Sequence, residues 1–514
     1  MSIELNMEQL NITEDKCPSK TRIINEADII VPDSKPDAVR VLEADAVPQI
    51  NEKYISRDYL TLSGTISYRI LYVSDGGTVE SIDYTAPFSQ QIDAQGADDG
   101  MTSCVHCSVS HVEHTVRNSR KLNVKSAIDV SAHAYDMSSV SLVSGVEADI
   151  SVPSRTAEAE SFNLALCSES TFGIDDTVKL PAASPMIDEI LKCDIRMAES
   201  ELKVVTNKAV AKGRLTLTTL YRSEGEICCA ENEIPFTQIT DVDSVTADMY
   251  TEADYDIKNL SCARELDDDG TMSLINVRAD ICMTIRAYEE KSFRYISDVY
   301  SPDYDIEVES APLTIGTLAD TATAQHTVNE SVPFDDGCTV DKIYSMTTSV
   351  CVERCAISCN RVEIGGFVTV CLLGRGECGV CSAQRQIPFE HEMPLSRAVD
   401  ERCARAAANA AIEHASYNIE SDTSVQVRIV LRISSKVMCE RMVNAVTGIV
   451  FDEEKKIDKS AQSGITVYFV QSGDELWDIA KRYHTTSEDI LGANKLESDV
   501  TLGVGQQLLI PKRN

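Results

Sequence analysis

The residues most able to do chemistry lie in one short segment near position 110. Cysteine and histidine recur there within eleven residues, at Cys104, His106, Cys107, His111 and His114. Zinc sites are built from such side chains in close pairs. If the segment is a β-strand, however, alternate side chains point to opposite faces, which separates Cys107 and His111 from the other three. We therefore favour ordinary strand residues over a zinc site, and we expect neither a metal nor another cofactor.

Other patterns typical of catalysis are weak or missing. Cys378 and Cys381 have the CxxC spacing, but a lone pair of this kind is a weak signal for metal or redox chemistry. The sequence contains no GxxxxGK[ST], HExxH or GxSxG motif. We therefore predict no catalytic residues and expect that the protein is not an enzyme. A metal-using enzyme built on the Cys/His segment is an alternative hypothesis.

Composition narrows the class of protein further. The 514 residues carry 82 Asp and Glu against 47 Lys and Arg, a net charge of -35. Such a charge repels nucleic acids and anionic membranes, so neither is an expected partner. The sequence contains no run of 18 apolar residues, so no membrane insertion is expected. The first eight residues lack the features of a secretory signal. We expect a cytosolic chain whose 18 cysteines are mostly reduced.

Internal repetition organises most of the chain. At three places a proline lies 32 residues before a glycine, and a Pro-Phe pair follows that glycine by 22 or 23 residues. The glycines are Gly64, Gly213 and Gly365, which are 149 and 152 residues apart. Because independent landmarks keep the same register, the sequence predicts three copies of a unit of about 150 residues.

Each copy shows the alternation of apolar and polar residues that is typical of half-buried strands. From Leu60 to Tyr72 the even positions are apolar except for Gly64, and a similar alternation returns from Leu122 to Val130. Turn residues follow the first run at positions 74–77. These patterns predict antiparallel sheets, plausibly packed as a sandwich.

A short amphipathic helix is also expected in each copy. Apolar residues there have the i, i+3, i+4 spacing of one helical face, after a proline in the first two copies and after Gly337 in the third. The predicted fold class is therefore mainly β, with one short helix in each of three tandem repeats. The residues with helical spacing are Ala38, Val41 and Leu42; Ile187, Ile190 and Leu191; and Val340, Ile343 and Tyr344.

The last 50 residues follow a different pattern. A short strand at 468–470 precedes a helix that Asp474 is expected to cap, and Thr486 starts a second helix in the manner of a capping box. A strand at 508–511 completes a small α+β domain of the order strand, helix, helix, strand. The chain is thus divided into an N-terminal extension at 1–27, repeats at 28–176, 177–328 and 329–458, a linker at 459–465, and a C-terminal domain at 466–514.

The C-terminal domain resembles the LysM family in residues 468–480, in Asn494 and in residues 505–511. The resemblance implies a shallow groove that binds N-acetylglucosamine polymers such as peptidoglycan. Glu475 stands where the family usually has Thr or Ser, and Val504 where it usually has proline, which weakens the expectation of sugar binding. Carried over by position, the groove is formed by Gly473, Asp474, Glu475 and Leu476 on one side and by Asn494, Lys495 and Leu496 on the other.

Trp477 is the only tryptophan of the chain. At ~100° per residue it lies at the rim of the apolar face of its helix. It is therefore expected to be a half-buried residue at the core edge, an anchor for a partner, or both, because tryptophan is favoured at the centres of interfaces.

Three Pro-x31-Gly…Pro-Phe units followed by one LysM domain resemble the SipL family of spore coat morphogenetic proteins, whose repeats are SPOCS domains. The resemblance implies a non-enzymatic scaffold in the mother-cell cytoplasm, at the forespore surface, that is required to localise the coat. It also implies that the LysM domain binds stage IV sporulation protein A, the ATPase of the basement layer of the coat, with other coat proteins as further partners. Peptidoglycan binding through the groove is the alternative. Cross-linking of surface cysteines in an oxidising coat is a further hypothesis.

Overall fold

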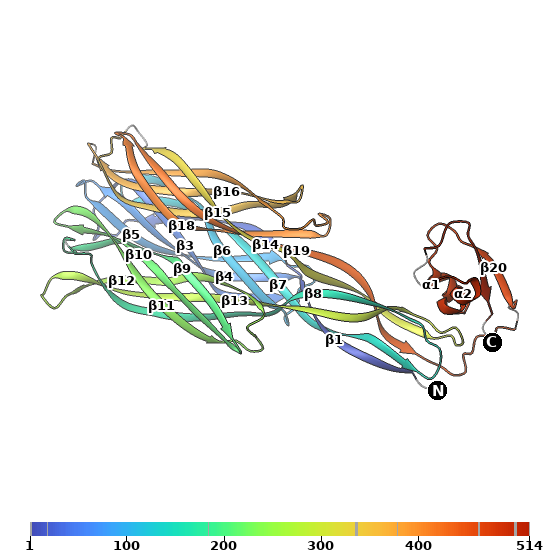
Figure 1. Ribbon diagram of the computed structural model, residues 1–514. Helices are drawn as coiled ribbons and strands as arrows, with labels where there is room; N and C mark the ends of the chain where they lie inside the picture. Colours follow the sequence, from blue (N-terminus) through green and yellow to red (C-terminus); the bar gives the residue numbers. More distant parts are fainter. Residues whose placement is uncertain are drawn as a thin grey trace.

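The chain folds mostly into long antiparallel strands, and its described helices lie in the C-terminal domain (Figure 1). The computed structural model describes residues 3–17, 19–182, 184–334, 338–377, 379–460, 463–497 and 501–512. The mainly β fold class predicted from the sequence is confirmed.

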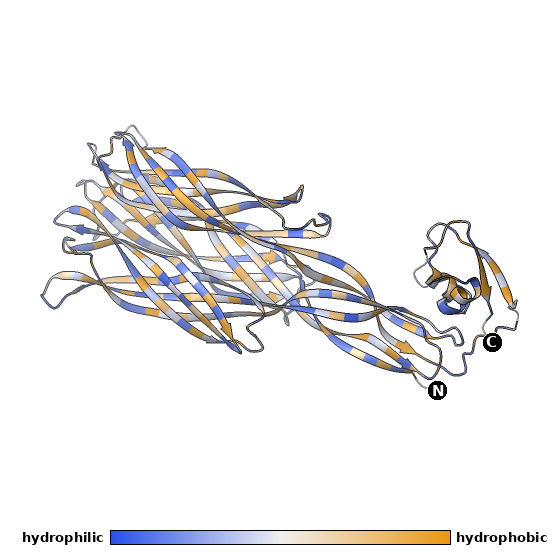
Figure 2. Ribbon diagram, in the orientation of Figure 1, coloured by the Kyte–Doolittle hydropathy of each residue, from blue (hydrophilic) through white to orange (hydrophobic). Residues whose placement is uncertain are grey.

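Two sheets enclose one hydrophobic core in the first repeat. One sheet has the order β3-β4-β5, and β7 is the centre of the other, between β2 and β6. The inward residues Leu60, Ile66 and Ile128 are 0% exposed, so the predicted alternation is confirmed. Figure 2 shows the same alternation along the other strands. The strands are β1 Ile3–Asp15, β2 Ser19–Ile30, β3 Ala38–Ser56, β4 Tyr59–Ser74, β5 Val79–Asp93, β6 Thr102–Asn118 and β7 Lys121–Ala148.

The second and third repeats have the same arrangement of strands. Their sheets have the orders β11-β10-β9 and β12-β13-β8, and β15-β16-β17 and β14-β19-β18. β8 and β14 run the whole length of their partner strands, where the first repeat uses the two strands β1 and β2. The strands are β8 Ser154–Lys179, β9 Glu189–Val205, β10 Lys208–Ser223, β11 Glu226–Asp241, β12 Tyr250–Leu266, β13 Met272–Val299, β14 Glu307–Pro333, β15 Lys342–Ser358, β16 Arg361–Gly376, β17 Gly379–Pro394, β18 Ala404–Ser421 and β19 Ser424–Val450.

The strand pairing places the repeat boundaries differently from the sequence prediction. Residues 3–15 and 19–30, most of them predicted to be an N-terminal extension, form β1 and β2 and pair with β7. The predicted boundaries at 176/177 and 328/329 fall inside β8 and β14. Each repeat therefore begins with the strand that pairs with its last strand, and the units span 3–148, 154–299 and 307–450.

The predicted helix in each repeat is wrong, because the residues concerned lie in or just before β3, β9 and β15. The cause is a β-bulge: Leu42, Leu191 and Tyr344 are each the extra residue at a register shift. The residue before each bulge packs on the core of its own repeat, while the bulged residue points to the other side. Two adjacent residues that serve two different cores thus imitate helical spacing. Gly337, part of this prediction, lies outside the described residues.

The glycine that recurs in each repeat packs against the ring of the recurring Pro-Phe pair. A Cβ atom at Gly213 would lie 2.3 Å from the Glu199 carbonyl oxygen and 2.6 Å from the Phe236 ring. At Gly64 of the first repeat the corresponding neighbours are the Gln49 carbonyl oxygen and the Phe88 ring, at 2.0 and 2.9 Å. In the third repeat the equivalent residue is Gly366, which pairs with Phe389, and not the predicted Gly365. No side chain fits between the bulged strand and the phenylalanine ring, which explains why a glycine recurs at this position in every repeat.

The three repeats meet around a common centre. The bulged residues Leu42, Leu191 and Tyr344 belong to one buried hydrophobic cluster, which we call the central cluster. Its other buried members are also equivalent positions of the repeats: Leu71, Leu220 and Leu373, and Val79 with Ile227. The repeats are therefore arranged with pseudo-threefold symmetry.

A buried charge cluster breaks this symmetry next to the central cluster. Lys192, whose side chain is 5% exposed, lies 3.0 Å from carboxylate oxygens of Glu43 and of Asp194 and also contacts Asp45. Glu43, Lys192 and Ser345 occupy equivalent positions, because each stands opposite the same leucine of its repeat. The pKa of Glu43 is raised to about 7, because burial disfavours its charge and Asp45 repels it.

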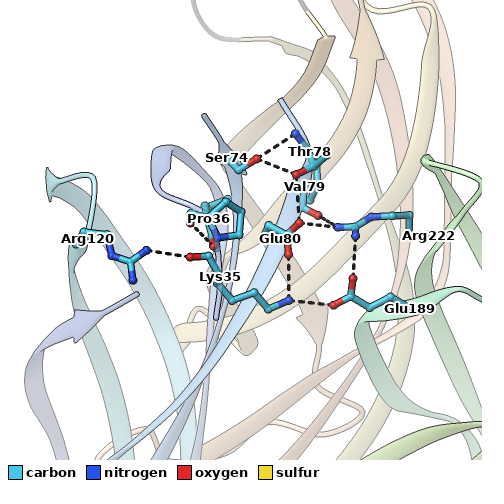
Figure 3. Close-up of polar contacts among 10 residues, drawn as sticks. Lys35, Pro36, Ser74, Thr78, Val79, Glu80, Arg120, Glu189 and Arg222 are labelled. Atoms are coloured by element: carbon cyan, nitrogen blue, oxygen red, sulfur yellow. Dashed lines mark hydrogen bonds and ion pairs between the residues drawn. The ribbon is translucent and has the colours of Figure 1, made fainter. Parts of the chain in front are cut away.

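Alternating charges join the rims of the first and second repeats (Figure 3). Lys35 lies 3.0 Å from Glu80 of its own repeat and 2.9 Å from Glu189 of the second. Arg222 of the second repeat contacts the same two carboxylates at 2.9 and 2.8 Å. Two cations thus alternate with two anions across this interface.

Beyond the centre the long strands continue as a stem. The ends of β7, β13 and β19, with β1 and β14, surround another cluster that includes Val143, Ile296 and Val446, and β8 pairs with β13 to its end. These three residues again come from the three repeats. Figure 1 shows the strands tapering together toward the C-terminal domain.

Candidate binding site on the C-terminal domain

The C-terminal domain has the predicted order of strand, helix, helix, strand. β20 Ile465–Phe469 pairs with β21 Gln507–Pro511, and α1 Leu476–Arg482 and α2 Ser487–Asn494 lie between them. Thr486 is the N-cap of α2, where its side chain accepts a hydrogen bond from the Asp489 amide at 3.1 Å, as predicted. The core contains Val470, Ile479 and Ile490, all at most 3% exposed.

The first side of the predicted groove holds the turn before α1. Asp474 accepts hydrogen bonds from the Gln471 amide at 2.8 Å and from the Tyr468 hydroxyl at 2.6 Å. These bonds lower the pKa of Asp474. The prediction that Asp474 caps α1 is wrong, because Glu475 occupies the N-cap and makes no capping bond. Gly473 has φ +91°, a conformation that favours glycine.

The second side of the predicted groove is tied to the sheet. The Asn494 side chain donates to the Leu509 carbonyl at 2.6 Å and accepts from the Leu509 amide at 2.7 Å. Lys495 follows in the left-handed conformation that ends α2, with φ 54°. Leu496, like Leu476, packs partly against the domain core. Asn494 therefore ties the end of α2 to β21.

Trp477 anchors the domain on the stem of its own chain. Its Nε1 donates to Asp298 of β13 at 2.8 Å, and its ring packs edge-on against Tyr300, with centroids 4.9 Å apart. Lys481 donates to the same carboxylate at 2.7 Å. Although burial disfavours the Asp298 carboxylate, the bonds from Lys481 and Trp477 outweigh that effect and lower its pKa. Trp477 is half-buried at the edge of the domain core, as expected, and packs on the stem of its own chain; its role as an anchor for a partner stays a prediction.

Further contacts complete this docking surface. Arg155 of β8 lies 2.5 Å from Glu475, and its guanidinium stands 5.4 Å from the centre of the Trp477 ring. The Tyr300 hydroxyl donates to the Thr485 carbonyl at 2.9 Å. Sequence reasoning missed Arg155, Asp298 and Tyr300, because they lie more than 170 residues from the residues they bond to in this domain.

The segment predicted as a linker is partly attached to the stem. Lys459 lies 2.8 Å from Asp303, and the Ile457 amide donates to the Asp303 carbonyl at 3.0 Å. Of the predicted linker at 459–465, residues 461 and 462 lie outside the described residues. The chain between the last repeat and the C-terminal domain is therefore held at least as far as Lys459.

The outer face of the small sheet is apolar and exposed. Ile465, Val467 and Phe469 of β20 are 62%, 48% and 60% exposed, and Leu509 of β21 lies beside Val467. We call these four residues the sheet patch. Alternation along β20 explains it, because the intervening Tyr468 faces the helices.

The Cys/His segment forms strand β6, as expected. His106 pairs with Asp256 of the second repeat at 3.3 Å, and a register shift separates Val109 from His111. Among the described residues no group of three His, Cys, Asp or Glu side chains is placed to hold a metal ion. Cys378 of the CxxC pair lies outside the described residues, whereas Cys381 is buried on β17. No helix in the described part is long and apolar enough to cross a membrane.

Comparison with known families agrees with this architecture. Residues 37–117 and 186–265 match the family model of the SipL SPOCS domain, and residues 468–511 match that of the LysM domain. One SPOCS match lies in each of the first two repeats, and the third repeat has the same strand pairing. No curated protein and no solved structure matches the chain.

Proposed function

Since the chain carries SPOCS domains of the SipL type and a LysM domain, we propose that it is a non-enzymatic scaffold of the spore coat whose LysM domain binds a coat protein. The SPOCS matches support a role in sporulation, and the LysM match supports a binding role. The observation that carries the proposal is that Asp474, Glu475, Trp477 and Asn494 make side-chain bonds within the chain, while the side chains of the sheet patch are exposed and make no such bonds to the residues that the structure describes.

A sugar chain would have to compete with internal bonds for much of the groove. Asn494 is bonded to Leu509, and Glu475 and Trp477 face the stem. Losing such bonds without replacement costs free energy, which lowers the affinity for any ligand that cannot restore them. The groove is therefore poorly prepared for glycan.

The sheet patch is suited to a protein partner. Exposed apolar patches rimmed by polar residues mark protein interaction sites, and an aromatic anchor such as Phe469 is favoured at their centres. The resemblance to the SipL family names the coat-basement ATPase, stage IV sporulation protein A, as this partner. The proposed location is accordingly the mother-cell cytoplasm, at the forespore surface.

Binding of the full-length chain to the ATPase and to insoluble peptidoglycan tests the proposal. Phe469→Ser is expected to weaken ATPase binding at least tenfold, because it removes the largest side chain of the sheet patch. Ile239→Ser, which changes an equally exposed apolar residue on β11, is the matched control and is expected to bind normally. Full ATPase affinity in the Phe469→Ser variant contradicts the proposal.

Peptidoglycan binding is the second candidate, favoured by the LysM match. In that case the wild-type chain sediments with peptidoglycan and Phe469→Ser does so equally well. Lys495→Glu, at the edge of the groove, then lowers the sedimented fraction. Sedimentation with no ATPase binding would reverse the ranking of the two functions.

A further inference from the structure

The three interfaces between repeats differ in the residues at one equivalent position along the long strands. Each repeat carries a nitrogen-bearing side chain at the same position of its longest strand: His133 on β7, Arg286 on β13 and Lys436 on β19. The residues directly opposite them on the neighbouring strand are Cys104, Glu252 and Ala407. Cys104 and Glu252 contact the next repeat, whereas Ala407 is exposed.

The second and third repeats are joined at this level by an ion pair. Lys436 lies 2.9 Å from the Glu252 carboxylate. At the equivalent place between the first and second repeats, Arg286 Nη1 donates to Cys104 Sγ at 3.8 Å. A thiol thus replaces the carboxylate that accepts from the cation of the next repeat.

A second thiol completes this interface. Cys167 stands opposite Arg286 on β8 and hydrogen-bonds to Cys104. Cys104 is 5% exposed and Cys167 is half-buried, and neither forms a disulfide in the structure. Two thiols from different repeats therefore lie side by side next to a guanidinium.

The surroundings favour the thiolate form of Cys104. The hydrogen bond from Cys167 lowers the pKa of Cys104 to about 6, against the effect of burial and with help from Arg286 and His133. The pKa of Cys167 is raised by the same hydrogen bond and by burial. One thiol of the pair is thus the nucleophile and the other the proton-bearing partner.

We propose that Cys104 and Cys167 form a redox modification site, where a hydroperoxide converts the pair into a disulfide that joins the first and second repeats. The Cys104 thiolate attacks one peroxide oxygen, the O–O bond breaks, and the leaving hydroxide takes a proton to become water. The resulting sulfenic acid is attacked by Cys167, the S–S bond forms, and a second water leaves. Two thiols and one hydrogen peroxide thus give one disulfide and two waters.

The other hydrogen-bonded thiol pairs provide an internal comparison. Cys193 contacts Cys262, and Cys439 contacts Cys403, each within a single repeat. The Cys193 thiol donates to the Thr219 hydroxyl, and Arg69, which helps to lower the pKa of Cys262, donates to the Cys193 backbone carbonyl at 3.4 Å. These pairs are expected to react later than Cys104 and Cys167.

Hydrogen peroxide treatment of the full chain tests the site. After a brief exposure and alkylation of the remaining thiols, mass spectrometry of the unreduced digest is expected to find the peptide of Cys104 linked to that of Cys167. Dithiothreitol is expected to remove this link. Cys193→Ser is the control and is expected to keep it.

Single variants keep the test decisive. Cys167→Ser is expected to abolish the link and leave a sulfenic acid on Cys104 that dimedone labels, in a protein whose circular dichroism is unchanged. If Cys193 and Cys262 cross-link first, or if Cys104 is alkylated after peroxide without any link to Cys167, the proposal is wrong.

Discussion

Two sets of polar contacts join distant parts of this chain, and they differ in how deeply their side chains are buried. At the centre of the body, Lys192 is buried among carboxylates of the first and second repeats. At the end of the stem, Asp298 binds Trp477 and Lys481, whose side chain is 44% exposed. Breaking one side of a buried charge cluster is costly, whereas exposed ion pairs contribute little. The packing of the repeats on one another is therefore strongly stabilised, while the LysM domain is held by contacts that a partner can displace.

The largest expected effect follows from removing the central cation. Lys192→Met leaves Glu43, Asp45 and Asp194 close together without it, and should destabilise the body by about 3–5 kcal/mol. Urea unfolding at pH 8 measures the loss. Lys35→Met, on the more exposed rim of the same interface, is the control and should cost much less. Equal losses in the two variants would show that depth does not distinguish these charges.

A pH series separates the charge at the centre from its packing. The pKa of Glu43 rises from 4.5 to about 7 on folding, so its contribution is full below pH 4.5 and is lost as the pH rises through 7. The free energy of unfolding should therefore fall by on the order of 3 kcal/mol between pH 4.5 and 8. Glu43→Gln should remove most of this slope, as measured by urea unfolding at several pH values. A slope as steep in the variant as in the wild type would assign it to other groups.

The features predicted correctly depend on residues close together in the sequence. The alternation from Leu60 to Tyr72 identifies β4, because one buried face requires apolar residues at every second position. The repeat landmarks and the LysM order were found for the same reason. The helix prediction failed because a bulge directs Val41 and Leu42 into two different cores, which only the assembled repeats reveal.

The features that were missed depend on contacts between distant parts of the chain. Lys192 and Glu43 are 149 residues apart, and Trp477 and Asp298 are 179 apart. A lone lysine in a strand and a lone aspartate near a strand end look like ordinary surface residues. Trp477 could be singled out because it is the only tryptophan, but the surface it binds could not.

Glycine substitutions extend the comparison from charge to packing. Gly213→Ala in the body places a Cβ against a backbone oxygen and the Phe236 ring, and should destabilise the second repeat by about 2 kcal/mol. Gly492→Ala in α2 meets no atom within 4 Å and should stabilise the LysM domain by about 0.5–1 kcal/mol. Calorimetry of the full chain measures both. A tolerated Gly213→Ala would show that the bulged strand can move aside.

A modest effect is expected at the contact that holds the LysM domain. Asp298→Ala removes the acceptor of Trp477 and Lys481 without changing any residue of the domain itself. Docking should weaken by about 1.4 kcal/mol, which is tenfold in the ratio of docked to undocked chains. Limited proteolysis after Lys459 should then be several-fold faster, and X-ray scattering should show a larger radius of gyration.

Asp280→Ala on the same strand is the matched control, because it removes an equal charge far from the docking surface. Unchanged proteolysis and scattering in Asp298→Ala would mean that Tyr300 and Arg155 hold the domain by themselves. If the domain does separate, Trp477 becomes available to other proteins while the centre of the body stays intact. A partner that binds the sheet patch could then also capture the surface around Trp477, and the stem and the partner would compete for it.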